Sequence, residues 1–150
     1  MRTFNTVADY VAEKGKEIGV SDWVTIDQDR VNLFADATGD HQWIHIDPDR
    51  TQRDLGMGTI AHGYLTLSLL PYLTSQISTV KSATRGINYG ANQIRFTNMV
   101  PVGSRVRCRV ALKDATPKAG GTQITNEVTM EIEGQERPAM VAETLSLIFE

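Results

Sequence analysis

All three histidines of this sequence lie in one short segment that also carries several aspartates. His41, His45 and His62 share it with Asp36 and Asp40. Asp40 and His45 stand out, because a carboxylate and an imidazole on one ordered loop can point into the same small volume. Their ordinary pKa values, about 3.9 and 6.5, suit them to hold a water molecule between a base and an acid. Such a pair can hydrate a conjugated double bond: one group takes a proton from water as its oxygen attacks the β carbon, and a proton reaches the α carbon.

Gly63 follows at the point where this segment is predicted to become a helix. At a helix N-terminus the free amides and the helix dipole favour negative charge, so the Gly63 N–H can stabilise charge on a thioester carbonyl. Spacing alone leaves two alternatives open for the aspartates and histidines. In one, Asp40 caps a helix and His45 is a hydrogen-bonded core residue. In the other, the three histidines and Asp36 or Asp40 hold a zinc ion.

Two predicted helices flank the segment and must position it. The first begins at an aspartate cap, Asp27 or Asp29, and ends at Gly39. The second runs from Tyr64 to Ile77 and is apolar on nearly every side, which places it inside the protein. Pro71 lies within it and predicts a kink or a local break.

The second half of the chain changes to period-two alternation, which predicts an antiparallel sheet with one dry and one charged face. Cys108 lies on the dry face, where a free cysteine acts as a small hydrophobe. On the charged face, a basic row in one strand is expected to meet an acidic row in the next. The apolar phase slips between Tyr89 and Ile94, which indicates a bulge near a ligand or a subunit edge. Long strands are expected at Gly86–Phe96, Arg105–Lys113, Thr122–Glu133 and Ala139–Phe149, with a short strand at 23–26 and a surface helix at 6–18.

Together these elements predict an α+β protein in which an antiparallel sheet wraps around a central helix, as one domain over residues 1–150. A formal net charge of −3, with no run of lysine or arginine, offers no broad field for nucleic acid. No stretch approaches the ~20 apolar residues of a membrane span, and the N-terminus lacks the apolar region of a secretory signal. The single cysteine cannot form an intrachain disulfide, so we expect a cytoplasmic protein without nucleic-acid or membrane partners.

The aspartate- and histidine-rich segment resembles the hydratase motif of MaoC-like proteins, which include R-specific enoyl-CoA hydratases and nodulation-factor N-like proteins. The family motif runs Gly-Asp-x-Asn-Pro-aliphatic-His, and Gly39, Asp40, Ile44 and His45 align with it without a gap. The stretch GTIAHGYLTLSLL that begins at Gly58 also resembles the family. The likeness extends from about residue 28 to residue 149, because the helix, loop, central helix and sheet occur in the family's order.

This resemblance implies a hotdog fold, in which Asp40 and His45 hold the catalytic water and the Gly63 amide polarises the thioester carbonyl. The implied reaction is the reversible syn hydration of trans-2-enoyl-CoA to (R)-3-hydroxyacyl-CoA, in fatty-acid metabolism. It needs neither a metal nor an organic cofactor, since coenzyme A is part of the substrate.

Five further residues are expected to contact the substrate or to support those that do. Gln42 and Trp43 stand where the family motif has asparagine and proline, so they change the loop and the acyl chains that fit. His62 is expected to brace the oxyanion site beside it. Tyr89 and Gly90 lie on a strand that is expected to shape the CoA or acyl channel, because hotdog proteins commonly form this tunnel between two subunits.

Three other functions use the same fold. A 3-hydroxyacyl-acyl-carrier-protein dehydratase would use the same residues in reverse, and a noncatalytic subunit would bind acyl-CoA without turnover. A hotdog thioesterase generally places a carboxylate on the central helix, and residues 63–77 contain none. A single sheet around one helix leaves an open edge, so we expect a homodimer that closes the tunnel.

Overall fold

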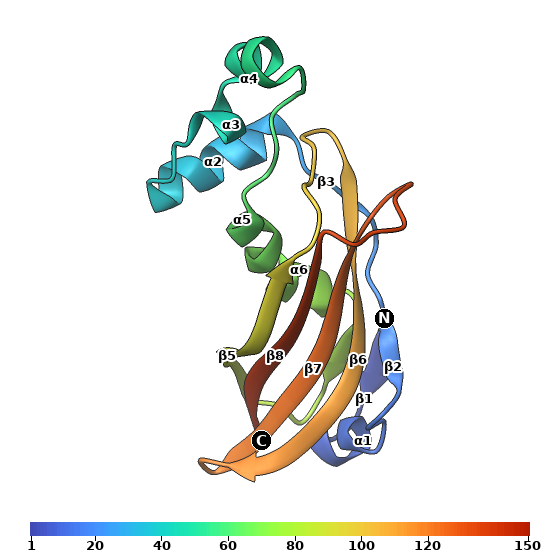
Figure 1. Cartoon of the computed structure of the whole chain (residues 1–150). Helices are drawn as coiled ribbons and strands as arrows, with labels where there is room; N and C mark the ends of the chain where they lie inside the picture. The colour runs from blue at the N-terminus through green and yellow to red at the C-terminus, as the bar shows by residue number, and fades with distance from the viewer.

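The computed structural model describes residues 1–150 and is built around one antiparallel sheet (Figure 1). Its strands follow the order β2 (Glu17–Val20), β6 (Arg105–Lys118), β7 (Gly121–Ile132), β8 (Met140–Phe149) and β5 (Arg85–Phe96), and β3 (Val24–Thr25) pairs with β6. Two short strands, β1 (Arg2–Phe4) and β4 (Ser78–Val80), form a separate parallel pair.

The alternation of β6 and β7 gives the sheet its dry face and its charged face, as predicted. Cys108 is fully buried between apolar neighbours, and burial raises the pKa of its thiol to about 12. On the other face Arg107 and Arg109 both contact Glu131, at 2.6 and 2.8 Å. These contacts confirm the expected pairing of a basic row with an acidic row.

The central helix is not continuous but forms two short helices, α5 (Gly63–Ser68) and α6 (Leu70–Ser75), which meet at Leu69. Pro71 lies in the first turn of α6, where its missing N–H costs no helical hydrogen bond, so the predicted break is confirmed. The prediction of burial on nearly every side is wrong, since Tyr64 and Tyr72 are 67% and 54% exposed in the single chain.

The N-terminal helix is shorter than predicted. Helix α1 covers only Val7–Val11, and the reciprocal side-chain bonds of Thr6 and Asp9 cap its start. The chain then turns through Gly15, whose φ of +83° is a conformation that glycine adopts readily. Ile18 therefore lies in β2, where it is buried through pairing with the sheet rather than through a helix face.

Three helices gather at one end of the sheet and carry the aspartate- and histidine-rich segment (Figure 1). They are α2 (Gln28–Thr38), α3 (Trp43–Ile46) and α4 (Pro48–Leu55). The Asp27 side chain caps α2, and Gly39 ends it in the left-handed conformation, as predicted. The segment after Gly39 was expected to be a loop, but it contains both α3 and α4.

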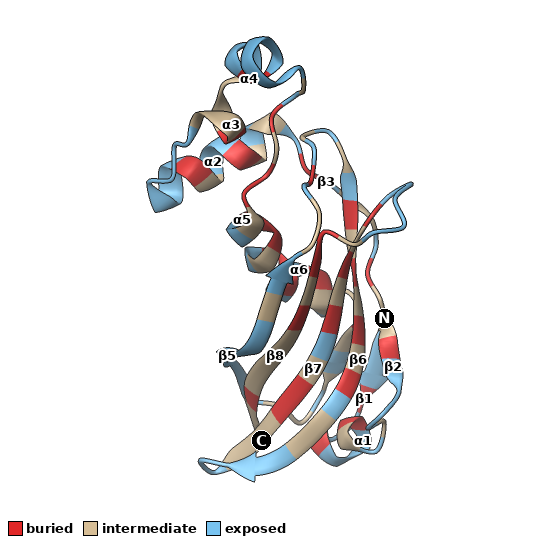
Figure 2. Ribbon diagram, viewed as in Figure 1, coloured by how far each residue is buried: buried red, intermediate tan, exposed pale blue.

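The core lies between the central helices and the dry face of the sheet (Figure 2). Leu65, Leu69, Leu70 and Leu73 contribute the helix side of this core. Strand β5 is the outermost long strand, and nearly all of its residues are exposed in the single chain. No helix is long and apolar enough to cross a membrane.

Candidate active site

His45 lies on the short helix α3 with one ring nitrogen held and the other unpaired. Its Nδ1 is 2.7 Å from the carbonyl oxygen of Ile60. Because a carbonyl can only accept, Nδ1 carries the hydrogen and Nε2 is left with its lone pair in the neutral ring. Burial, to 7% exposure, lowers the pKa of His45 below its usual 6.5, and the neighbouring His62 adds to this effect. The neutral form of His45 is therefore favoured near pH 7.

Asp40 directly follows the glycine that ends α2, and the structure brings its carboxylate next to His45. A carboxylate oxygen of Asp40, a ring nitrogen of His45 and a ring nitrogen of His62 lie within 4.8 Å of one another. No hydrogen bond joins the Asp40 side chain to the His45 ring, so the gap between them suits one bridging water, which needs about 2.8 Å to each partner. The only group that the Asp40 carboxylate accepts from is the backbone N–H of Gln42, at 3.4 Å.

The third residue of this cluster, His62, contacts both Asp40 and His45. Its Nε2 is 3.0 Å from the backbone carbonyl of Asp40, to which it donates. Its ring stacks on that of His45, with centroids 3.9 Å apart and 24° between the planes, and Phe34 packs on it at 4.9 Å. The side chain is 2% exposed, and its Nδ1 has no hydrogen-bond partner. His62 therefore contacts both members of the pair.

A zinc site is the alternative to proton transfer at this cluster. The predicted three-histidine set is not assembled, because His41 lies outside the cluster and pairs with Asp36 at 2.9 Å. That contact raises the pKa of His41. Imidazole binds zinc in the plane of its ring, at about 2.0–2.1 Å. The stacked rings of His45 and His62 lie in planes only 24° apart, so lone pairs in those planes do not readily converge on one ion.

A pocket of about 430 Å³ opens beside His45 and includes the start of the central helix. Gly63 is the first residue of α5, where its N–H has no acceptor within the helix. A Cβ added at Gly63 would lie 2.9 Å from the ring of Phe96, which also lines the pocket. Glycine therefore lets the helix start lie directly against β5, with a backbone amide at the pocket wall.

Gln42 and Trp43 are placed away from this pocket. Gln42 is exposed at the start of α3, and Trp43 packs under the guanidinium of Arg50, 4.3 Å from the ring centroid. Neither residue lines the pocket beside His45. Their contact with substrate stays a prediction.

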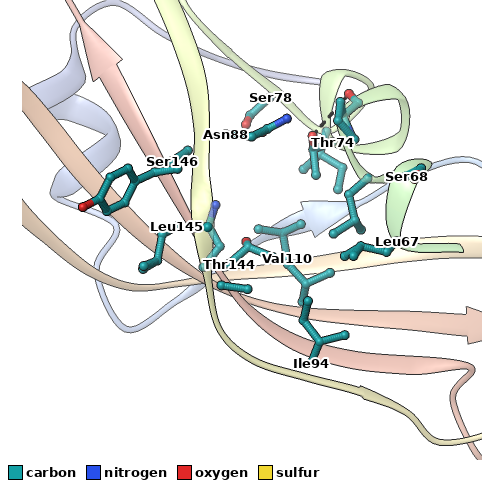
Figure 3. Close-up of a pocket in the computed structure, with 18 of the residues that line it drawn as sticks. Leu67, Ser68, Thr74, Ser78, Asn88, Ile94, Val110, Thr144, Leu145 and Ser146 are labelled. Carbon is teal, nitrogen blue, oxygen red and sulfur yellow. Dashed lines mark hydrogen bonds between the residues drawn. The ribbon is translucent and has the colours of Figure 1, made fainter. Parts of the chain in front are cut away.

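Tyr89 and Gly90 line a second, larger pocket of about 640 Å³ between β5, the central helices and the sheet (Figure 3). The pairing of β5 with β8 shifts register at Asn88 and again after Ala91, which confirms the predicted bulge. Figure 3 shows Leu67 and Thr74 from the helices and Leu145 from β8 around the same space. His45 and Gly63 do not line this pocket, so the single chain keeps the two sets of predicted residues apart.

Two residues near the site were not identified from the sequence. The Gln28 amide donates to the His45 carbonyl at 2.7 Å and accepts from the Thr59 hydroxyl at 2.5 Å, so it ties α2 to α3. A glutamine in the first turn of a helix gives no signal of this. Arg137 lines the pocket beside His45, but it lies too far along the chain for spacing to reveal it.

Comparison with known proteins adds independent information. Residues 9–135 match the family described as MaoC like domain. The 3-hydroxyacyl-thioester dehydratase Z of Mycobacterium tuberculosis (strain ATCC 25618 / H37Rv) is 54% identical over 146 residues, 97% of each chain. Nodulation protein N of Rhizobium leguminosarum bv. viciae is 43% identical, over 95% of this chain and 91% of that protein. The solved structure of unliganded R-hydratase PhaJ1 from Pseudomonas aeruginosa aligns with a TM-score of 0.73 at 20% identity, over 92% of this chain and 83% of that one.

The likeness to solved structures establishes the fold, while the family match covers the segment that holds Asp40, His45 and Gly63. The family is one of hydratases and dehydratases, so the chain is an enzyme of that class. From its sequence and its fold, the chain belongs to the MaoC-like dehydratase family and has the hotdog fold.

Proposed function

We propose that the chain is an (R)-specific enoyl-CoA hydratase, which reversibly converts trans-2-enoyl-CoA to (R)-3-hydroxyacyl-CoA. The observation that carries the proposal is the pairing of Asp40 with a neutral His45 across a gap that suits one water. A pocket with a backbone amide at its wall adjoins this pair. Hydration needs these three parts in one place.

The proposed mechanism begins with a water held between Asp40 and His45. The water donates one hydrogen to the Asp40 carboxylate and the other to the unpaired Nε2 of His45, so its oxygen lone pair faces the substrate. As the water oxygen bonds to the β carbon, one residue of the Asp40–His45 pair takes a proton from the water. The double-bond electrons move toward the thioester carbonyl. The residue that took this proton then returns a proton to the α carbon from the same face, which completes a syn addition.

Gly63 supplies the second part of the mechanism. Negative charge develops on the thioester oxygen as water adds, and an N–H at a helix start stabilises it. Removing one such donor typically costs about 10²–10³ in rate. His62, which is adjacent, keeps the catalytic pair aligned through its contacts with the Asp40 carbonyl and the His45 ring.

The proposed enzyme is a homodimer that pairs through β5. This strand is a sheet edge of 12 residues, and Ile87, Tyr89 and Phe96 are each more than two-fifths exposed on it. A long, apolar, unpaired edge is a template for pairing with a second chain. Tyr89 and Gly90 would then shape a channel that the second copy closes.

The proposed reaction uses no metal or organic cofactor and takes place in the cytoplasm. The residues that hold water and stabilise charge are all protein groups, so nothing in the mechanism depends on a bound ion. Hydration by protein dialysed against EDTA should equal that of untreated protein. A loss that Zn²⁺ restores would revive the zinc alternative at Asp40 and His45.

The test is the hydration of crotonyl-CoA, followed by the loss of ultraviolet absorbance of its conjugated double bond and by the chirality of the product. We expect turnover and the (R) product. The (S) product would contradict the assigned stereochemistry, and hydrolysis to free CoA would indicate a thioesterase.

A second candidate is a 3-hydroxyacyl-thioester dehydratase, favoured by the 54% identity to a protein of that name. The same residues would run the reaction in reverse, and the carrier could be an acyl-carrier protein. Comparing kcat/KM for matched CoA and acyl-carrier-protein thioesters separates the two. Binding of both without turnover would favour the noncatalytic subunit instead.

A further inference from the structure

The pocket beside His45 carries one permanent charge. Its lining is otherwise apolar or neutral, with Gly63, Thr66 and Phe96 among the lining residues, and it contains no carboxylate. The charge belongs to Arg137, an exposed residue on the turn between β7 and β8. A cation at the rim of an uncharged pocket favours a ligand that has an anionic group outside the reacting part.

Two loops fix the backbone around Arg137. The Asn98 amide donates to the Arg137 carbonyl at 3.3 Å and to the Gln135 side chain at 2.6 Å. The Thr97 hydroxyl donates to the Pro138 carbonyl at 2.5 Å. Thr97 and Asn98 also line the pocket, so these bonds hold the backbone of Arg137 at its rim.

The guanidinium of Arg137 has no partner within the chain, unlike those of Arg50 and Arg53 at the same end of the molecule. Arg50 stacks on Trp43 and contacts Asp54, and Arg53 contacts the same carboxylate. Arg137 makes no salt bridge, hydrogen bond or cation–π contact through its side chain. This turn has two acidic residues: Glu133 is paired with Arg105, and Glu136, which directly precedes Arg137, forms no ion pair with it. All five N–H donors of Arg137 are available to a ligand.

We propose that Arg137 binds a phosphate of the thioester carrier and thereby selects phosphorylated carriers. The inference rests on the proposed function, since the thioester must reach Gly63. Coenzyme A and acyl-carrier proteins share a phosphorylated pantetheine arm, and coenzyme A adds nucleotide phosphates. Arginine suits this task, because its planar fork binds phosphate oxygens in pairs.

The test compares wild type with Arg137→Gln on three substrates: crotonyl-CoA, crotonyl-4′-phosphopantetheine and crotonyl-pantetheine, which has no phosphate. A lost charge-assisted contact should raise KM for crotonyl-CoA about tenfold with little change in kcat. Wild type and Arg137→Gln should have equal KM and kcat on crotonyl-pantetheine. Loss on both phosphorylated substrates assigns the pantetheine phosphate, and loss on crotonyl-CoA alone assigns the nucleotide phosphates.

Arg53→Gln is the matched control, because it removes the same charge from an exposed helix outside the pocket. It should leave all three substrates unchanged. Equal losses on crotonyl-pantetheine and crotonyl-CoA in Arg137→Gln would overturn the proposal, since they would show a structural role for the loop. So would unchanged kinetics on every substrate. A wild type that hydrates none of the three would instead count against the proposed function.

Discussion

At the scale of single residues, the site depends on the protonation and orientation of His45. The Ile60 carbonyl fixes the hydrogen on Nδ1, and burial favours the neutral ring. Both effects leave Nε2 as an acceptor for water. Asp40 is exposed beside it, so the pair consists of a buried histidine and a solvent-exposed aspartate.

The pH dependence of hydration should report this lowered pKa. The neutral form of His45 persists below pH 6.5, so kcat/KM should stay level through pH 6.5 and fall only at lower pH. Stability should follow the same direction: the unfolded histidine binds its proton first, so the contribution of His45 to stability is lost as pH falls below about 6.5. A pH–rate profile whose acid limb lies above pH 6.5 would contradict this account.

His62 should act as a positioning residue through its contacts with Asp40 and His45. His62→Phe keeps a flat ring but removes the hydrogen bond to the Asp40 carbonyl, so kcat should fall roughly tenfold. The neighbouring His62 also lowers the pKa of His45, so its removal should shift the acid limb of the profile to higher pH. His62→Gln, which retains a donor, should recover part of kcat. A variant that loses stability without any shift of the acid limb would reduce His62 to a packing residue.

At the scale of elements, the site depends on where helices begin and end. Gly39 ends α2 directly before Asp40, His45 lies on α3, and the Gly63 amide lies at the start of α5. These three points are joined by side-chain bonds rather than by a continuous helix, with Gln28 linking α2 to α3.

The contact between the start of α5 and β5 should be intolerant of a methyl group. In Gly63→Ala the new Cβ meets the Phe96 ring at 2.9 Å, so the ring or the helix must move and hydration should fall at least tenfold. The double variant Gly63→Ala/Phe96→Ala should recover activity over Gly63→Ala. Gly58→Ala is the control, because nothing lies within 4 Å of a Cβ there. Full activity in Gly63→Ala would remove the steric argument.

The sequence allowed the long strands, an aspartate cap at Asp27 or Asp29 and the break at Pro71 to be predicted, because each depends on local pattern. The end of α1 could not be predicted, because the placement of Ile18 in β2 depends on pairing with a strand that is distant in the sequence. Helix α3 escaped prediction because its four residues are too few to show a helical period, and α4 because its eight residues are nearly all polar. Asp40 and His45 were found through their motif, whereas Gln28 and Arg137 act through contacts that chain order does not encode.

At the scale of the whole molecule, the unpaired edge of β5 predicts association. Wild type should be a dimer by light scattering at micromolar concentration, because a second copy covers the exposed apolar side chains of this strand. Ile87→Lys places a charge on the edge and should shift the population toward monomer. Leu33→Lys, a change of the same kind on α2, should not. A monomeric wild type would refute the dimer and the channel between subunits.

The central claim is that Asp40 and His45 together hold the water that is added. Its most direct test is the rate of crotonyl-CoA hydration by wild type, Asp40→Ala and His45→Ala, with Asp36→Ala and His41→Ala as controls. The controls remove the same residue types from the same segment, outside the cluster. We predict that each of the first two variants loses roughly 10²–10⁴ in kcat while the controls stay near wild type. Wild-type rates in Asp40→Ala or His45→Ala would contradict the account.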